Sequence, residues 1–450
     1  MSMLGLPLPV LLSSAAYLCL SAAYSVRQRS LAARPEAIDG RDTPAGDFRP
    51  SVDVIVTCFN EDVNLLESCL RSVLDQDYPT ELLRVFIVDD GSSNIAELER
   101  VYGAYAARPG WLVVRAPRNQ GKRLAQDTAN GLGFGDLVLM VDSDTVIERD
   151  GIARLVSRFT DEEVGAVCSN IKVLNRGTNW LTKAQTHRYD LLFNQERAAQ
   201  SRLGAVLCCA GPFAMFRRAA LDAEVELPLS LWRDADTERA TVWRHYLRQR
   251  PLPLLGRRAC VSGDDLHLTH LVLLAEYRSE YEPTAVALTQ VPEELGHFRR
   301  QQQRWNRSMY RELPWTLILL LRRRAPDLWL DVAGRALLPL LLVAVQLQLA
   351  GLALLGGREG AVAAGTVAGA LLVGHWLGLP RQHRSPGFFL RYGAVYVGML
   401  LPVKLYALAT PLVGSWGTRL APSPRPLALA PPLRRLARLR TARDGVGEAA

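Results

Sequence analysis

Two aspartates separated by one serine follow an apolar run, and this arrangement suits cation binding. The run 137–141 has the length and composition of a buried strand, and Asp142 and Asp144 come directly after it. A D-x-D turn presents both carboxylates to one side, and hard oxygen ligands suit Mg or Mn bridging to a diphosphate. The turn could instead cap a helix predicted over 151–159, but further polar motifs upstream favour the cation site.

Those upstream motifs stand at the ends of other predicted strands. Asp89-Asp90-Gly91-Ser92 follows one strand, and Asn119-Gln120-Gly121-Lys122 joins the next strand to a helix. Lys122 could meet a phosphate there, since the helix N-terminus also favours anions. A Gly-Lys turn alone is weak support for this. The chain contains neither G-x-G-x-x-G nor the P-loop sequence, which speaks against an ordinary dinucleotide or P-loop protein.

The elements that must position these motifs alternate between strand and helix. Strands are predicted over 52–57, 83–88, 112–116 and 137–141, and helices over 64–74, 95–105, 123–132 and 151–159. This alternation is typical of a doubly wound α/β sheet with both faces covered. Ligands bind beyond the carboxyl ends of the strands in such sheets, and the acidic motifs fall at those ends.

The 450 residues leave room for one catalytic domain and something more. Uncharged stretches at 3–25, 336–355 and 361–374 bracket a charged middle from 51 to 311. This distribution predicts a soluble domain flanked by membrane segments. The seven cysteines form no C-x-x-C pair, so neither a disulfide framework nor a zinc ribbon is indicated. A reducing cytosol around the middle domain fits this cysteine usage.

The first segment, 1–26, is predicted to be a transmembrane anchor rather than a cleaved signal, because no positive charge precedes it. Arginines follow it, so the positive-inside rule places the middle domain, 50–312, in the cytosol. A membrane region is predicted over 313–415, with spans at 336–355 and 361–379.

The stretch 388–413 is apolar but carries Arg391 and Lys404, and it is predicted to be an interfacial helix. The region after it, 416–450, holds seven arginines against two acidic residues, a net +5 of the chain's +8. Beside hydrophobic spans, anionic membrane lipid explains this charge better than nucleic acid does. The region 416–450 is therefore predicted to be a basic cytosolic tail.

The ordered motifs resemble those of family 2 glycosyltransferases with the GT-A fold. V-x-V-I-V-T-C-F-N-E, D-D-G-S, N-x-G-K and D-S-D occur in that family's order, and Gly263-Asp264-Asp265 before L-H-L-T resembles its base-bearing motif. One departure is Leu266, where the subgroup often carries Arg. Gln301–Trp305 matches the Q-x-x-R-W motif of its processive membrane synthases. Further stretches are similar to hyaluronan synthases and nodulation-type chitin oligosaccharide synthases: 194–201, 209–215, 401–406 and 416–419.

The resemblance, which covers about residues 50–420, implies a UDP-sugar donor and direct inversion at the anomeric carbon. Asp144, with Asp142 orienting it, would hold the Mg or Mn that compensates charge on the leaving diphosphate. Asp265 is the expected base for the acceptor hydroxyl and Asp264 the alternative, although one of them could cap a helix. The expected donor-binding residues are Thr57, Asn60, Glu61, Asp89, Lys122 and Asp142.

In the Q-x-x-R-W motif, Gln301 lies one helical turn from Arg304 and Trp305. Arg304 is expected to pair with a diphosphate oxygen, and Trp305 to stack on a pyranose, with membrane anchoring as the alternative role. Gly211 and Pro212 are expected to border the acceptor together with Trp305. Cys208-Cys209 is interpreted as small-residue packing near the acceptor rather than as a nucleophile.

The predicted function is a multi-pass cell-membrane enzyme that polymerises an N-acetylglucosamine-containing polysaccharide. A hyaluronan synthase needs UDP-GlcNAc and UDP-glucuronate, whereas a chitin synthase needs UDP-GlcNAc alone. The motifs G-D-D at 263–265 and W-G-T-R at 416–419 favour the hyaluronan type slightly, while 194–201 resembles the chitin type at least as much. A non-catalytic membrane polysaccharide-binding protein is the alternative from another class, but Asp144, Asp265 and Arg304 are all present. Expected partners are the UDP-sugar, the growing polysaccharide and membrane lipid.

Overall fold

The computed structural model describes residues 7–33, 48–228, 237–248, 262–323, 326–379 and 385–413. The chain divides into two compact units. The sheet unit comprises Ile38–Asn175, Gly204–Val291 and Leu412–Ala450, and the helical unit comprises Met1–Ala37, Arg176–Leu203 and Pro292–Pro411. The predicted motif 416–419 and the predicted tail 416–450 lie outside the described residues.

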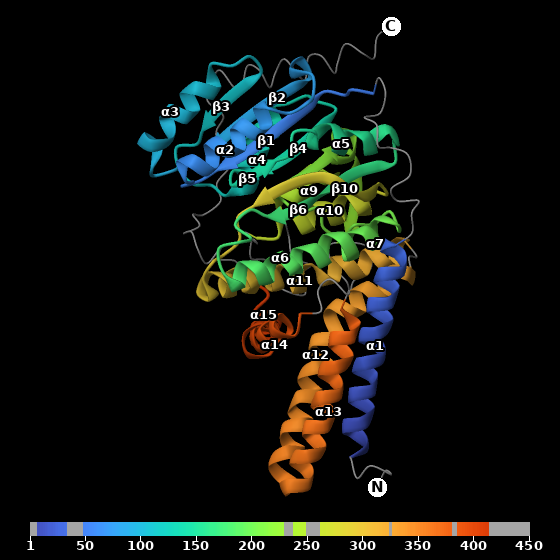
Figure 1. Ribbon diagram of the computed structural model, residues 1–450. Helices are drawn as coiled ribbons and strands as arrows, with labels where there is room; N and C mark the ends of the chain where they lie inside the picture. Colours follow the sequence, from blue (N-terminus) through green and yellow to red (C-terminus); the bar gives the residue numbers. More distant parts are fainter. Residues whose placement is uncertain are drawn as a thin grey trace. The chain divides into compact units, whose positions relative to one another are not determined.

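An eight-stranded mixed sheet forms the centre of the sheet unit, in the order β3-β2-β1-β4-β7-β6-β10-β5 (Figure 1). A separate hairpin joins β8 (Glu224–Pro228) and β9 (Thr237–Thr241). The strands of the main sheet are β1 (Val52–Cys58), β2 (Leu83–Asp89), β3 (Trp111–Arg115), β4 (Leu137–Asp142), β5 (Thr145–Ile147), β6 (Val164–Val173), β7 (Phe213–Arg217) and β10 (Arg278–Thr289). The helices of this unit are α2 (Val63–Leu74), α3 (Ile95–Ala106), α4 (Lys122–Leu132), α5 (Gly151–Ser157), α8 (Arg218–Asp222), α9 (Val242–Arg248) and α10 (Asp264–Leu274).

The first four strands confirm the predicted parallel arrangement, and each lies within one residue of its predicted bounds. β1, β2 and β4 are buried along nearly their whole length, as strands with both faces covered must be. The remainder of the sheet is not parallel throughout. β7 runs antiparallel between β4 and β6, and β5 runs antiparallel to β10.

Asp53 is the one charged residue inside β1 and is fully buried. Its carboxylate accepts hydrogen bonds from Arg84 Nε at 2.7 Å, an Arg218 Nη at 2.6 Å and the Gly135 backbone N at 2.6 Å. These bonds join β1 to β2 and to α8. Removing one partner of such a buried pair costs about 3–5 kcal/mol, so the polar interruption in the strand is a structural anchor.

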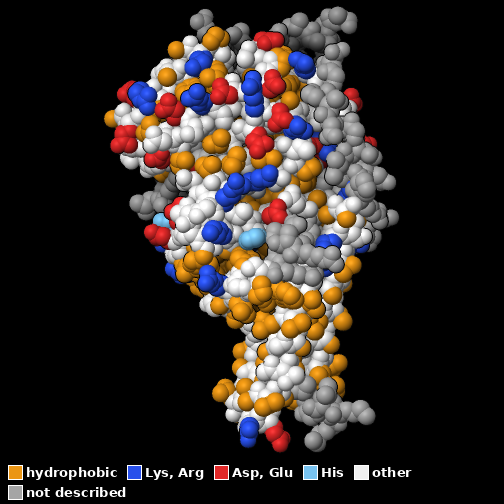
Figure 2. All heavy atoms as spheres, viewed as in Figure 1, with side chains coloured by type: hydrophobic (Ala, Val, Ile, Leu, Met, Phe, Trp, Pro, Cys, Tyr) orange, Lys and Arg blue, Asp and Glu red, His pale blue; other side chains and the backbone are white. Residues whose placement is uncertain are grey.

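The helical unit contains a bundle of three long helices, α1 (Leu8–Ala32), α12 (Pro326–Leu355) and α13 (Gly357–Gly378). They run side by side in Figure 1, and Tyr17, Val345 and Leu371 form their common core. A hydrogen bond of 2.7 Å between Tyr17 and His375 adds a polar link between α1 and α13. The face seen in Figure 2 is largely apolar along this bundle.

The other helices of this unit are α6 (Trp180–Leu191), the π-helix η4 (Leu192–Arg197), α7 (Ala198–Ser201), α11 (Leu295–Arg323), α14 (Pro386–Val395), the π-helix η7 (Tyr396–Leu400) and α15 (Leu401–Ala409). Leu181 of α6, Phe298 of α11 and Leu400 of η7 form one apolar cluster. α15 runs along α11 and also contacts α12 of the three-helix bundle. The α14–α15 segment therefore packs on α6 and α11.

Four described helices are long and apolar enough to cross a membrane: Leu8–Ala32, Leu328–Leu355, Gly357–Leu377 and Pro386–Ala409. The chain is thus a membrane protein with a separate globular unit. The first three helices correspond to the predicted anchor and the two predicted spans, although α12 begins well before residue 336. The fourth contains the stretch predicted to be interfacial, and that placement stays a prediction.

The division into units differs from the predicted domain 50–312 in two places. Residue 312 falls inside the continuous helix α11, and the segment Arg176–Leu203 belongs with the membrane helices. Within that segment Glu196 accepts from Arg335 at 2.9 Å, and Gln200 donates to Asp331 at 2.7 Å. The segment is therefore tied to α12 by buried polar contacts, which hydrophobic periodicity does not reveal.

Two points at which the chain leaves the sheet unit are fastened to each other. Asn175 precedes the segment Arg176–Leu203, and Val291 precedes α11. The Asn175 side chain donates to the Val291 carbonyl at 2.9 Å and accepts from the Val291 N at 3.0 Å. This reciprocal pair closes the sheet unit at both exits.

Candidate active site

The carboxyl ends of β1, β2 and β4 are aligned by the sheet register. Cys58 lies opposite Asp89, and Thr57 lies opposite both Val88 and Asp142. The residues that follow these strands must therefore meet at one edge of the sheet, as predicted for this class of sheet. Thr57 itself is only partly buried at the end of β1.

Asp89 and Asp90 shape the loops at this edge. Asp89 is buried, and its carboxylate accepts from the backbone N atoms of Gly91 and Ser92 and from the Tyr102 hydroxyl at 2.6 Å. Asp90 accepts from the backbone N atoms of Gln120 and Gly121, both at 2.8 Å. Burial raises the pKa of Asp90 to about 6, although both N–H donors oppose the rise. Direct contact between Asp89 and a nucleotide stays a prediction.

Gly91 is required where these two loops touch. Its φ is +77°, and a Cβ at this position would lie 2.4 Å from the backbone carbon of Arg118. No side chain fits there without moving the 118–121 loop. The D-D-G-S motif therefore packs directly against the turn that ends at Lys122.

The loop after β1 is tied to the D-x-D turn by Glu61. Its Oε2 accepts from the hydroxyl of Ser143, the middle residue of D-x-D, at 2.7 Å. The neighbouring Asn60 has a positive φ of 51°, and its Oδ1 accepts from the Ser93 N at 2.7 Å. Both predicted donor-binding residues therefore hold loops of this edge in place.

Lys122 stands between the two acidic motifs. Its ammonium lies 2.6 Å from Asp142 Oδ1 and 3.6 Å from Asp264 Oδ2. Burial lowers the pKa of Lys122, but the two carboxylates outweigh burial and raise it above its ordinary value. Lys122 therefore stays charged, and it draws together acids that are far apart in the sequence.

Asp144 lies in a concentration of negative charge. Burial, Asp142 and Glu61 together raise the pKa of its carboxyl to about 7. The hydroxyls of Thr145 and Thr289 lie 3.3 and 3.4 Å from its Oδ1. A divalent cation would relieve this repulsion, and the carboxylate oxygens are the ligand type that Mg or Mn prefers.

In the described part of the chain, no group of three or more His, Cys, Asp or Glu side chains could hold a metal ion alone. The two carboxylates of the D-x-D turn fit a cation of this kind, which would supply positive charge to a diphosphate. Asp142 and Asp144 would hold it.

Asp265 lies in the first turn of α10, which begins at Asp264. The N-cap is Gly263 with φ 81°, so neither acid is the capping residue. Burial and Asp264 raise the pKa of Asp265, while Lys122 and the N–H groups of Leu266 and Gly211 lower it. A carboxylate whose pKa is raised is the better proton acceptor.

Gly211 lies where the two motifs converge. A Cβ on Gly211 would be 3.2 Å from Lys122 Nζ and 3.9 Å from both Asp142 Oδ2 and Asp265 Cβ. The neighbouring Pro212 carbonyl accepts from the Asp142 N at 3.2 Å. The predicted acceptor-side glycine therefore touches the donor-side lysine and the expected base.

The Q-x-x-R-W residues are placed in the helical unit. Gln301, Arg304 and Trp305 all lie on α11, as the helical spacing predicts, and the Trp305 side chain is exposed. The structure thus brings together the predicted residues of the sheet unit and assigns these three to the other unit. Their contact with substrate stays a prediction.

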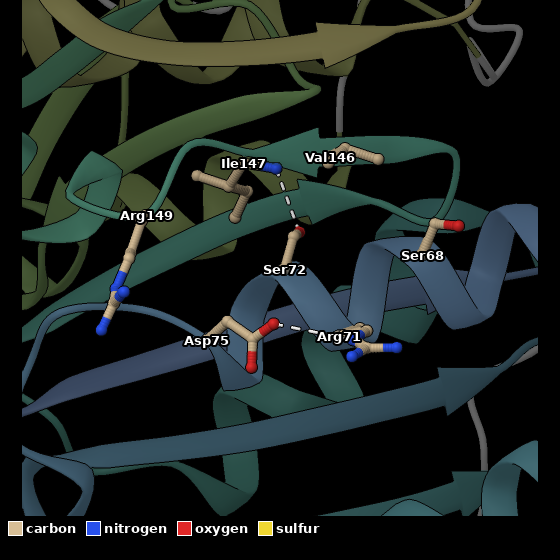
Figure 3. A pocket seen from close by; sticks show the side chains of 7 residues that line it. All are labelled: Ser68, Arg71, Ser72, Asp75, Val146, Ile147 and Arg149. Carbon is tan, nitrogen blue, oxygen red and sulfur yellow. Dashed lines mark hydrogen bonds and ion pairs between the residues drawn. The ribbon is translucent and has the colours of Figure 1, made fainter.

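A hollow of about 650 Å³ lies between α2 and β5 (Figure 3). None of the predicted site residues lines it; its walls are Ser68, Arg71, Ser72, Asp75, Val146, Ile147 and Arg149. Ser72 Oγ accepts from the Ile147 N at 3.0 Å and so fastens β5, which follows Asp144 directly, to α2. The hydrogen bond between Ser72 and Ile147 therefore supports the D-x-D turn, which directly precedes β5.

Three contributors to the site were not predicted. Asp90 is part of the motif Asp89-Asp90-Gly91-Ser92, so its position beside Asp89 could have indicated that it contributes to the site. Cys208, whose Sγ lies 3.5 Å from Asp265 Oδ2, was interpreted as packing alone. Thr289 reaches Asp144 from the end of β10, and no sequence pattern connects the two.

A mixed sheet with acidic motifs at the carboxyl ends of its parallel strands, in a chain that also carries long apolar helices, is the architecture of a membrane-associated enzyme of the GT-A class. The comparisons with known proteins agree. The family described as "Glycosyl transferase family 2" matches residues 53–224. The N-acetylglucosaminyltransferase of Rhizobium meliloti (strain 1021) is 40% identical over 412 residues, which cover 90% of this chain and 89% of that protein. The corresponding protein of Mesorhizobium japonicum is 40% identical over 390 residues, 84% of each chain.

Among solved structures, the mannosyltransferase PcManGT from Pyrobaculum calidifontis, in complex with GDP-Man and Mn²⁺, has a similar fold. Its TM-score is 0.62 at 20% identity, over 90% of this chain and 98% of that one. The chain belongs to the family 2 glycosyltransferases, in the group that includes the rhizobial N-acetylglucosaminyltransferases. The expected fold class and enzyme class are both confirmed.

Proposed function

We propose that the protein is a processive inverting β-glycosyltransferase that polymerises N-acetylglucosamine from UDP-GlcNAc at the cell membrane, with the sheet unit in the cytosol. The relatives are N-acetylglucosaminyltransferases, which supports the single-donor, chitin-oligosaccharide type over the hyaluronan type that the Gly263-Asp264-Asp265 motif favoured. The observation that carries the proposal is the convergence of Lys122, Asp142 and Asp265 around Gly211.

In the proposed reaction, the acceptor hydroxyl attacks the anomeric carbon from the face opposite UDP. Its proton passes to Asp265, the new glycosidic C–O bond forms, and the bond to UDP breaks with its electron pair. Lys122 sits beside Asp142, where it neutralises part of the diphosphate charge. Mg or Mn, bound by Asp144 and Asp142, would supply further charge compensation. Direct displacement needs no covalent nucleophile.

Gln301, Arg304 and Trp305 are proposed to serve the diphosphate and the acceptor. Arg304 offers a planar fork that matches phosphate oxygens, and Trp305 offers a flat apolar face on which a pyranose can stack. The exposed side chain of Trp305 on α11 is compatible with this role.

The base assignment is tested by Asp265→Asn in the purified full-length protein. The variant should bind UDP-GlcNAc normally and lose about 10²–10⁴-fold in transfer rate, since only the proton acceptor is removed. Asp264→Asn is the matched comparison, because Asp264 is the alternative base. Near-normal turnover of Asp265→Asn would assign the role to Asp264 or refute the site.

The cation and the donor are tested in the same preparation. Excess EDTA should abolish UDP release, and Mg or Mn should restore it; release that continues unchanged in EDTA would overturn the cation assignment. UDP-GlcNAc alone should yield a chitin-type product. A product that forms only when UDP-glucuronate is added as well would show the hyaluronan type instead.

A further inference from the structure

The segment from Cys208 to Gly211 is locked against the first turn of α10. The Cys209 backbone N donates to the Thr269 hydroxyl at 2.9 Å, and that hydroxyl donates to the carbonyl of Asp265 at 2.7 Å. Cys209 and Thr269 are both fully buried. The segment and the backbone of Asp265 therefore form one rigid piece, and small groups on the segment are held at fixed positions near the carboxylate.

The carboxylate of Asp265 receives three donors in this arrangement. The Leu266 N donates to Oδ1 at 2.8 Å, and the Gly211 N approaches Oδ2 at 3.4 Å. The third donor is the thiol of Cys208, at 3.5 Å from the same Oδ2. Two of the three are backbone groups that almost any residue supplies. The third is a side chain, and it alone changes with the identity of the residue.

We propose that Cys208 is a positioning residue for the base, and that its thiol orients Oδ2 of Asp265 and sets how readily this carboxylate takes the acceptor proton. The inference rests on the proposed role of Asp265 as the base. The thiol keeps its own proton throughout; it gives up only part of its hydrogen bond as the acceptor proton arrives at the carboxylate.

The choice of a thiol has a chemical consequence. A donor to a carboxylate favours the charged form and so makes it a weaker base. A thiol is a weak donor, whereas a hydroxyl at the same place would be a stronger one. Cys208 therefore fixes the carboxylate while weakening its basicity less than Ser would. The hydrogen bond from the thiol lowers the pKa of Asp265, and so opposes burial and Asp264, which raise it.

The test compares Cys208→Ala and Cys208→Ser with the wild type in the full-length protein. It measures kcat at saturating UDP-GlcNAc as a function of pH and locates the acidic limb of the profile, where kcat falls as pH is lowered. Loss of the donor in Cys208→Ala should move the limb to higher pH by about 0.5–1 unit. The stronger donor in Cys208→Ser should move it to lower pH. The order Ala, wild type, Ser is the distinguishing readout, because a packing role does not predict it. Cys19→Ser, an exposed cysteine of α1, is the control and should not move the limb.

A limb at the same pH in all three proteins would overturn the inference, even if the variants melt at lower temperature, since packing alone would then explain the residue. If Cys208→Ala fails to fold, the direction of the shift in Cys208→Ser decides the question by itself. Asp265→Asn separates the two proposals. If it remains active, the assignment of the base has failed; if it is inactive and the limbs are unmoved, only the role of Cys208 has failed.

Discussion

Replacing Lys122 by Met tests whether the acids of the site are held together by one ammonium group. Met preserves most of the volume of the side chain and removes the charge. In the wild type the ammonium contacts Asp142 at 2.6 Å and Asp264 at 3.6 Å, and the exposed fractions of the three side chains are 20%, 31% and 12%. Lys122→Met would leave the carboxylates of Asp142 and Asp264 partly buried and without the ammonium group between them.

The magnitude follows from that exposure. A unit-charge pair near 4 Å is worth about 4 kcal/mol at an effective dielectric constant of 20, before desolvation is subtracted. Removing one partner of a fully buried pair costs about 3–5 kcal/mol. Because water reaches part of Asp142, we expect Lys122→Met to lower the free energy of unfolding by about 2–3 kcal/mol. For a domain of this size that loss lowers Tm by roughly 5–10 °C.

The loss should depend on pH in a stated direction. In the wild type, burial raises the pKa of Asp144 and of Asp265, and Lys122 opposes both rises. Without the ammonium, the folded variant binds protons at these two carboxylates still more readily than the unfolded chain does. Its deficit in stability is therefore full when the carboxylates are ionised and shrinks as pH falls and they take up protons. Mg should also raise the Tm of Lys122→Met more than that of the wild type, since a divalent cation can replace the lost charge.

The assay is thermal melting of the purified protein in detergent at several pH values, with and without Mg. Lys172→Met is the matched control, because Lys172 is an exposed lysine on β6 of the same unit. Equal melting of Lys122→Met and the control at neutral pH would refute the view that Lys122 compensates the acidic pair. A deficit that grows on acidification would contradict the sign of the argument.

Two further predictions concern the scaffold and the membrane. Gly91→Ala should cost at least about 2 kcal/mol of stability, because the residue has φ +77° and its Cβ would meet the Arg118 backbone. Gly103→Ala is its control: that helical position has open space, the change should be neutral or stabilising, and equal melting of the two variants would remove the role given to Gly91. For the membrane, we expect three crossings, with 388–413 at the inner interface. A cysteine at Ala450 should resist impermeant reagents in intact cells, and labelling without permeabilisation would show that 388–413 spans.

The sequence was sufficient for the parallel part of the sheet because each strand there is a short apolar run with a motif at its end. Leu83–Asp89 and Leu137–Asp142 are buried along their length, so periodicity and composition located them closely. β7 and β10 were not located, because long-range pairing and not local pattern decides where such strands insert. The antiparallel entry of Phe213–Arg217 between β4 and β6 is a case of this kind.

At the site, the motif residues were predictable but their partners were not. Asp142, Asp265 and Lys122 stand in recognisable patterns, whereas the contacts that orient them come from distant backbone. The donor from Gly211 to Asp265 is a backbone N–H, so no side chain in the sequence indicates this contact. The capping alternative for Asp264-Asp265 could be resolved only when Gly263 was found at the N-cap. The segment Arg176–Leu203 could not be assigned because its partners in α12 and η7 lie far along the chain.

The insertion of Arg176–Leu203 into the middle of the sheet unit governs how a soluble catalytic fragment can be made. Cutting the chain after Val291 removes Phe298 and Leu400, the partners of Leu181, and leaves the apolar side of α6 facing water. Such a fragment should aggregate although its sheet is intact. The reciprocal bonds between Asn175 and Val291 show that the sheet unit is already closed at both exits. A fragment that stays in solution therefore needs a short linker from Asn175 to Gly204 as well as the cut after Val291.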